Sequence, residues 1–152
     1  MVGRIFAFGD IHGHLSKLER LLGRIPFDPA QDKLIFLGDY IDRGPHSKEV
    51  VERLIALQES GAKTVFLRGN HEEMLLTEYL TGRFPELYHL NGGGATLRSY
   101  GLERIPPTQA RLPASHQAFF ESLLLYHREE GCIFVHAGLK PGLPLEKQAA
   151  HD

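Results

Sequence analysis

Short apolar runs alternate with longer stretches of helical periodicity along the first two-thirds of the chain. The apolar runs at residues 4–8, 33–37 and 64–67 have the length and character of strands buried on both faces. Between them, residues 14–24 and 47–59 place leucine, isoleucine and valine at the spacing of one helix face. This alternation predicts an α/β fold in which parallel strands are joined by helical crossovers.

The rest of the chain is less regular. Its pattern predicts helices over residues 72–80 and 115–124 and a turn at the glycines of residues 91–94. Residues 131–135 form a fourth apolar run, which predicts a fourth strand. Because no repeat, low-complexity tract or linker divides the sequence, residues 1–152 are predicted to form a single domain.

Composition excludes several classes of protein. The chain has 152 residues, 42% hydrophobic and 24% charged, with a net charge of −2 and no basic stripe that would indicate a nucleic-acid partner. No apolar run is long enough for a signal peptide or a membrane span, which predicts a cytoplasmic protein without a membrane partner. The only cysteine, Cys132, lies in an apolar run and is predicted to be buried, as is the leucine run at 123–125.

Each predicted strand is followed by a glycine next to a polar side chain. Asp10 and His12 follow the first strand, Asp39 the second, Asn70 the third and His136 the fourth. The carboxyl edge of an open α/β sheet is where ligands bind, so the pattern predicts a metal site there. The simpler alternative is that the aspartate and asparagine side chains cap the helices that follow.

The types of these residues restrict the metal. Imidazole, amide and carboxylate groups without a thiolate favour manganese, with iron, zinc or cobalt as alternatives, over calcium. Two such divalent ions about 3.5–4 Å apart can lower the pKa of a shared water and clamp a phosphate group. The sequence therefore predicts metal-assisted chemistry on a phosphate ester.

Four short motifs carry a resemblance to a known family. They read GDIHG at residues 9–13, GDYIDRG at 38–44, GNHE at 69–72 and HAG at 136–138. In this order and spacing, the chain resembles the calcineurin-like metallophosphoesterases of the serine/threonine phosphoprotein phosphatase type, particularly their small bacterial members. The segment NGGGATLRSY at residues 91–100 also looks like a bacterial segment. The resemblance implies a layered βαβ fold with central sheets flanked by helices.

The resemblance also implies a set of metal ligands. Asp10 and His12 would bind the first of two divalent metal ions, Asp39 would bridge both ions, and Asn70 and His136 would bind the second.

The catalytic residues are implied in the same way. His71 would protonate the departing oxygen as general acid, and Asp42 would accept a hydrogen bond from it and aim it. Arg43 would grip the phosphate oxygens through its planar guanidinium group. A hydroxide bound to both metals would attack phosphorus, so no phosphoenzyme is expected.

The chain departs from the family after residue 140. Family members continue with a further phosphate-binding arginine and a Gly-His metal ligand, and neither is recognisable here. His151 is interpreted as a tail residue and not as that ligand. The C-terminal strands are therefore expected to be missing, so residues 1–152 would be one metallophosphoesterase domain that is incomplete at its C-terminus. A truncated enzyme, self-association in which a second copy supplies the missing groups, and a one-metal relative all remain open.

Other histidines and glycines carry simpler interpretations. The glycines at 92–94 lack the lysine and serine or threonine of a phosphate-binding loop, so they predict only a turn. His14 is predicted to be structural, near the start of the first helix. Four further histidines are predicted to be surface residues without partners: His46, His89, His116 and His127.

Three functions fit these observations. The leading hypothesis is hydrolysis of phosphate monoesters, with a phosphorylated protein or a small phosphoester as substrate and phosphoserine or phosphothreonine as the favoured groups. The alternative enzyme is a symmetrical dinucleoside tetraphosphate hydrolase, because small bacterial relatives share these motifs. The third is a catalytically impaired remnant that binds metal without turnover.

Overall fold

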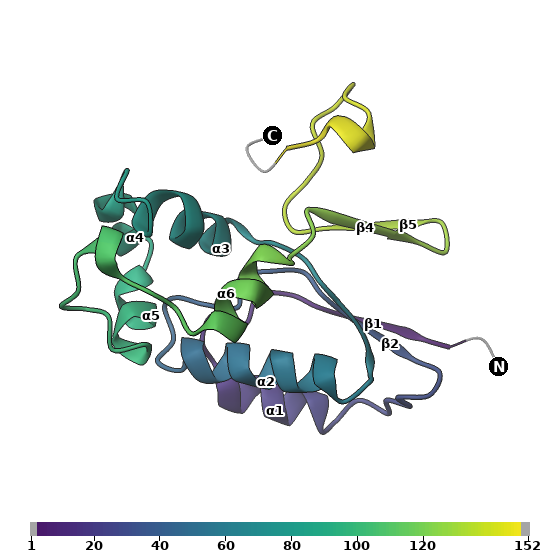
Figure 1. Cartoon of the computed structure of the whole chain (residues 1–152). Coiled ribbons are helices and arrows are strands. Elements are labelled where there is room, and N and C mark those ends of the chain that lie inside the picture. Colours follow the sequence, from purple (N-terminus) through teal and green to yellow (C-terminus); the bar gives the residue numbers. More distant parts are fainter. Residues whose placement is uncertain (1–2, 150–152) are drawn as a thin grey trace.

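The computed structural model describes residues 3–149, and its centre is a parallel sheet of three strands in the order β1-β2-β3 (Figure 1). The strands are β1 (Ile5–Phe8), β2 (Lys33–Phe36) and β3 (Lys63–Phe66). Helix α1 (Leu15–Leu22) connects the first two, and α2 (Ser47–Glu59) connects the second and third. The predicted α/β architecture is confirmed, and the carboxyl ends of all three strands meet at one edge.

Aromatic side chains on neighbouring strands stack on one another across the sheet. Phe8, Phe36 and Phe66 are paired neighbours, with ring centroids 4.6 Å apart for the first pair and 5.1 Å for the second. Phe119 packs on the edge of the Phe66 ring at 5.2 Å. These rings are at most 7% exposed, so they supply much of the apolar burial that holds the sheet together.

Short helices follow the third strand: those of residues 70–99 lie together beyond the carboxyl ends of the strands, whereas the helix at 114–121 lies beside α2 (Figure 1). The predicted helix over residues 72–80 is present, but it begins at Asn70 and widens into a π-helix after its first five residues. The predicted turn at residues 91–94 leads directly into a helix that starts at Gly93. The elements are α3 (Asn70–Met74), η1 (Leu75–Tyr79), α4 (Pro85–Leu90), α5 (Gly93–Ser99), η2 (Pro107–Gln109), α6 (Ala114–Glu121) and η3 (Leu145–Lys147).

The fourth predicted strand exists, but it does not extend the parallel sheet. β5 (Cys132–Val135) pairs antiparallel with β4 (Tyr126–Glu129), and this hairpin lies apart from β1 and β2 (Figure 1). A parallel bridge between Leu67 and Leu124 is the backbone link from the hairpin's lead-in to the end of β3. The expectation that four parallel strands share one edge is therefore wrong, and His136 reaches the site from a second sheet.

Side chains of this hairpin are more exposed than the sequence predicts. Cys132 is exposed, and Leu124, Leu125 and Ile133 are 47%, 38% and 46% exposed, whereas Leu123 is buried. Within residues 3–149, no element covers this outer face, so the prediction of a buried cysteine and a fully buried leucine run is wrong.

All four histidines predicted to lack partners have one. His46 and His89 are exposed as predicted, but His46 lies 3.9 Å from Glu49 and His89 packs on the Tyr79 ring with centroids 5.8 Å apart. His116 is 4% exposed and its Nδ1 lies 2.7 Å from the Tyr100 hydroxyl, while His127 pairs with Glu129 at 2.7 Å. His151 lies outside the described residues. None of the helices in residues 3–149 has the length and apolar character needed to cross a membrane.

Candidate metal centre

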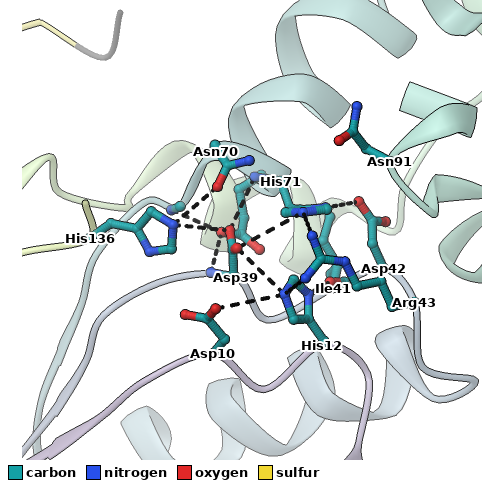
Figure 2. Close-up of polar contacts among 12 residues, drawn as sticks. Asp10, His12, Asp39, Ile41, Asp42, Arg43, Asn70, His71, Asn91 and His136 are labelled. Carbon is teal, nitrogen blue, oxygen red and sulfur yellow. Dashed lines mark hydrogen bonds and ion pairs between the residues drawn. The ribbon is translucent and has the colours of Figure 1, made fainter. Parts of the chain in front are cut away.

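Five side chains from four segments of the chain converge beyond the sheet's carboxyl edge. Figure 2 shows all of them turned toward the Asp39 carboxylate. Two follow β1, one follows β2, one opens α3, and one follows β5: Asp10, His12, Asp39, Asn70 and His136. The structure thus brings together the complete set of predicted ligands.

The Asp39 carboxylate lies in the middle of this group and is 4% exposed. Its Oδ2 is 3.6 Å from His12 Nε2, and its Oδ1 is 3.5 Å from His136 Nε2. His12 Nε2 is also 3.8 Å from Asp10 Oδ2. The two oxygens of one buried carboxylate therefore face two different imidazoles, an arrangement that suits a bridging ligand between two cations, and the Asp10 carboxylate is also within 4.8 Å of the Asp39 and His136 ligand atoms.

The orientation of both imidazoles fits a cation. His12 Nδ1 lies 2.9 Å from the Ile41 carbonyl oxygen, and His136 Nδ1 lies 2.9 Å from the Leu37 carbonyl oxygen. A carbonyl only accepts hydrogen bonds, so each Nδ1 carries a proton, and each Nε2 is left facing the Asp39 carboxylate, where a cation would meet it.

The contact between His136 and Asn70 fits a cation as well. His136 Nε2 lies 3.1 Å from Asn70 Oδ1. An imidazole nitrogen and an amide oxygen are both atoms that can ligate a metal, so a cation bound here would contact both side chains. The donor set of residues 3–149 therefore fits a metal.

The loops that carry these side chains adopt strained backbone conformations. Among residues 3–149, five non-glycine residues have a positive φ, and four of them belong to the site: His12 (46°), Asp39 (55°), Asp42 (72°) and Arg43 (64°). Such conformations cost about 1–3 kcal/mol each and persist only where the surroundings fix them. The strain is therefore concentrated where the side chains converge.

Close contact between loops is possible because glycines flank the ligands. A Cβ on Gly38, whose φ is +110°, would lie 2.5 Å from the backbone nitrogen of Gly69. Glycine at this position lets the loop after β2 lie directly against the loop after β3. Asp39 and Asn70 are brought together by that contact.

Glu72 holds the loop after β2 and the loop after β3 together through its buried side chain. Its fully buried carboxylate accepts hydrogen bonds from the backbone N–H groups of Asp39 (2.9 Å), Tyr40 (2.8 Å) and Gly69 (2.9 Å). Burial and then the nearby Asp39 charge raise the pKa of Glu72 to about 7. The sequence motif contains this residue, but its role as a link between loops becomes visible only in three dimensions.

His71 lies behind the cluster in a fully buried position. Its Nδ1 is 2.7 Å from Asp42 Oδ2, and its Nε2 is 4.0 Å from Asp39 Oδ2. Burial alone would lower the pKa of His71, but the hydrogen bond to Asp42 and the charges of Asp39 and Asp42 raise it above 6.5. By distance alone, His71 could complete a metal group with His12 and Asp39. Its hydrogen bond to a buried carboxylate equally suits an acid.

The Arg43 guanidinium contacts two histidines of the site. It donates to His12 Nε2 at 2.7 Å and to His71 Nε2 at 3.0 Å (Figure 2). This planar group therefore stands next to the ligand set, where an anion bound to cations would meet it.

Two hollows flank the cluster. One, of about 250 Å³, extends from Asn70 and His136 toward Arg68 and Tyr126. The other, of about 320 Å³, extends from Asp10 and His12 along α1. A ligand centred on the cluster thus has space on both sides.

The sequence did not reveal several groups that shape this site. They are the carbonyls of Leu37 and Ile41 and the hydroxyls of Tyr88 and Thr96, which donate to the Asp42 carboxylate. The only signal for Thr96 was its place in the NGGGATLRSY segment, and a lone helical tyrosine such as Tyr88 gives no signal.

Comparison with known proteins agrees with this geometry. The calcineurin-like phosphoesterase family matches residues 3–146. The symmetrical bis(5'-nucleosyl)-tetraphosphatase of Methylococcus capsulatus is 32% identical over 96% of this chain and 47% of its own length, and that of Pseudomonas syringae pv. tomato is 34% identical over 94% and 43%. Serine/threonine-protein phosphatase 1 of Salmonella typhimurium is 43% identical, but over 59% of this chain and 38% of its own length.

A solved structure extends the comparison to the fold. A crystal structure described provisionally as a diadenosine tetraphosphatase superposes with a TM-score of 0.69 at 27% identity, covering 99% of this chain and 57% of the other. The chain spans about half the length of the curated relatives it matches. With the match over residues 3–146 and these relatives above 30% identity, the chain belongs to the calcineurin-like phosphoesterase family.

Proposed function

We propose that this protein hydrolyses a polyphosphate linkage at a dimetal centre, and that its substrate is a symmetrical dinucleoside tetraphosphate. The observation that carries this proposal is the pair of hollows beside the ligand cluster, one lined by Asn70 and His136 and the other by Asp10 and His12. A substrate cut at its centre has two similar halves, and each half needs space beside the metals. The relatives that match along nearly the whole chain are named for this activity, so they favour it over phosphoprotein hydrolysis.

The ligand set supports two cations, in a family whose members use a dimetal centre. Asp10 and His12 would hold one cation, Asn70 and His136 the other, and Asp39 would bridge them. Bound there, such cations supply a water of lowered pKa and neutralise phosphate charge. The nitrogen and oxygen donors suit manganese, which we propose as the working metal.

His71 and Arg43 supply the remaining chemistry from the protein. The His71 imidazole, held by Asp42 and with its pKa raised, would carry the proton that the departing phosphate oxygen needs. Arg43 would leave its contacts with the two imidazoles and hold the phosphate oxygens through paired N–H donors.

A second candidate is hydrolysis of phosphoserine or phosphothreonine in proteins. The relative from Salmonella typhimurium supports it through its higher identity, 43% over 59% of this chain. The two candidates differ in substrate but share every residue of the proposed mechanism.

One side-by-side assay separates these possibilities. Purified protein with manganese is given diadenosine tetraphosphate, a phosphothreonine peptide and p-nitrophenyl phosphate. Release of ADP as the sole nucleotide product, with little turnover of the peptide, is the expected result. Turnover of the peptide alone would overturn the substrate proposal, and inactivity on all three would leave the metal-binding remnant.

His71→Asn tests the proposed acid in the same assay. It should lower kcat by about 10²–10⁴-fold, the usual contribution of a positioned acid or base. His89→Asn is the matched control, because His89 is exposed and contacts the Tyr79 ring instead of the cluster. Equal loss in both variants would contradict the role of His71.

Two further proposals concern the chain as a whole. We propose that residues 1–152 act as one metallophosphoesterase domain, supported by the family match over 3–146. We also propose self-association through the exposed apolar side chains of the β4–β5 hairpin, such as Leu124 and Ile133. Analytical ultracentrifugation of the wild type and of Ile133→Lys tests the second: a single monomer species for the wild type would overturn it.

A further inference from the structure

Asp42 is the most heavily bonded side chain near the proposed acid. Its Oδ2 accepts from His71 Nδ1 at 2.7 Å, while its Oδ1 accepts from the Tyr88 hydroxyl at 2.7 Å and the Thr96 hydroxyl at 2.6 Å. Its backbone N–H donates to Thr96 Oγ1 at 2.8 Å, and Ser47 Oγ lies 2.9 Å from that same hydroxyl. All five residues are at most 1% exposed.

This network joins parts of the chain that are far apart in sequence. Tyr88 comes from α4 and Thr96 from α5, about 50 residues after the loop that carries Asp42. Neither residue reaches the ligand cluster. Their hydroxyls end on the Asp42 oxygen that faces away from His71, so they act on the acid only through Asp42.

The backbone of the same loop is held by the same segment. Asp42 and Arg43 have φ values of 72° and 64°, which non-glycine residues rarely adopt. The Arg43 N–H donates to the Gly92 carbonyl at 3.2 Å, and a Cβ on Gly92 would lie 3.0 Å from Arg43 Cγ. A Cβ on Gly93 would collide with the Tyr88 ring. The NGGG segment at residues 91–94, which the sequence predicts as a turn, is therefore packed directly on the strained loop and on Tyr88.

Each hydroxyl has a defined state. Burial and the Asp42 charge raise the pKa of Tyr88 well above its usual range, so its phenol remains protonated and donates. The Thr96 hydroxyl donates to the carboxylate and accepts the Asp42 N–H, which fixes the side chain and backbone of Asp42 together. Because both oxygens of the Asp42 carboxylate are hydrogen-bonded, its plane is held in one orientation, and this fixes the His71 ring bonded to Oδ2.

We propose that Tyr88 and Thr96 are positioning residues that hold Asp42, and through it His71, in the orientation needed for proton transfer to the leaving group. This inference rests on the proposed function, since it assumes that His71 is the acid. It gives the α4–α5 segment a role in catalysis without any contact with substrate.

The test uses Tyr88→Phe and Thr96→Val, with Thr96→Ser as the conservative variant that retains the hydroxyl. The matched control is Tyr79→Phe. Tyr79 is 2% exposed and packs on Tyr88 with ring centroids 5.3 Å apart, but its hydroxyl makes only a 3.5 Å contact with the Ile105 carbonyl. Tyr79→Phe therefore removes a buried phenol hydroxyl next to the network without changing any contact of Asp42.

The primary readout is the dependence of kcat on the leaving group. Phenyl phosphate needs protonation of its departing oxygen far more than 2,4-dinitrophenyl phosphate does. Tyr88→Phe and Thr96→Val should lower kcat about 10-fold or more for phenyl phosphate and less than 3-fold for the dinitrophenyl ester, with KM unchanged. Thr96→Ser and Tyr79→Phe should leave the ratio of the two rates at the wild-type value.

Two outcomes would overturn the inference. Equal losses on both esters would mean a merely structural role, and so would a further leaving-group effect of Tyr88→Phe in a His71→Asn background, because the effect must act through His71. An inactive wild type would instead refute the proposed function.

A second readout does not require turnover. The proton on His71 Nδ1, assigned by its loss in His71→Asn, should shift or exchange faster in the NMR spectra of Tyr88→Phe and Thr96→Val but not of Tyr79→Phe. An unchanged signal would also overturn the inference.

Discussion

Removal of the Glu72 carboxylate should separate the loop that carries Asp39 from the loop that carries Asn70. In the native chain this carboxylate accepts three backbone N–H groups. Glu72→Ala leaves all three donors buried without an acceptor, and each orphan costs about 1–3 kcal/mol. The sum of about 3–9 kcal/mol is comparable with the whole stability of a domain, about 5–15 kcal/mol.

Glu72→Gln gives the sharper comparison. The amide oxygen can occupy the position of Oε2 and keep the bonds from Asp39 and Gly69, while its NH₂ group faces the Tyr40 N–H. One buried N–H without an acceptor, in place of three, predicts that the free energy of unfolding falls by about 1–3 kcal/mol. Because the pKa of Glu72 is raised to about 7, the neutral amide removes little charge stabilisation near neutral pH.

Thermal and urea unfolding measure both variants against Glu59→Ala, an exposed glutamate at the end of α2. At about 2–4 °C per kcal/mol for a domain of this size, Glu72→Gln should lower Tm by about 2–12 °C. Glu72→Ala should be far less stable or unfolded. Equal effects of the two substitutions, or effects as small as that of the control, would refute the argument from orphaned donors.

Three more measurements follow from the structure. The hydrogen bond from the Arg4 guanidinium is the main reason that the pKa of Asp32 lies well below its ordinary 3.8. A depressed pKa in the folded state adds stability above pH 3.8 that is lost as the pH falls, so Asp32→Asn should be destabilising at pH 7 and progressively less so toward pH 2. A difference in stability that stayed constant with pH would contradict this. Phe36→Ala, in the middle of the aromatic stack, should lower the free energy of unfolding by about 3–5 kcal/mol in urea titrations, and a loss below 1 kcal/mol would show that the stack is not part of the core. Manganese at about 100 times its Kd should add about 2.7 kcal/mol of stability for each bound ion, so about 5.4 kcal/mol for two, or about 11–22 °C in Tm by scanning fluorimetry. An Asp39→Asn variant that kept this shift would argue against the bridging role.

The first half of the fold could be predicted because its signals are local. Each buried strand is a continuous apolar run, each crossover helix has its own periodicity, and β1, β2 and β3 lie where those patterns predict. The candidate ligands could be located because each comes soon after the end of a strand, so the strand's end fixes its position.

The remainder could not be predicted because it depends on contacts between distant residues. Nothing in the run Cys132–Val135 distinguishes a strand of the parallel sheet from one of a separate hairpin, since both are short and apolar. His116 looks like a surface histidine until Tyr100 is seen beside it. The bonds from Tyr88 and Thr96 to Asp42 span 46 and 54 residues, and no sequence pattern indicates them.

The most direct test is the number of divalent cations that the chain binds. Equilibrium dialysis against manganese, followed by elemental analysis, should give two ions per wild-type chain and far fewer in Asp39→Asn. Asp28→Asn is the control and should bind as the wild type does, because the hydrogen bonds of Asp28 are with Ala30, Gln31 and Asp32. A chain that binds no manganese, or one whose binding is the same with and without the Asp39 carboxylate, would contradict the dimetal centre.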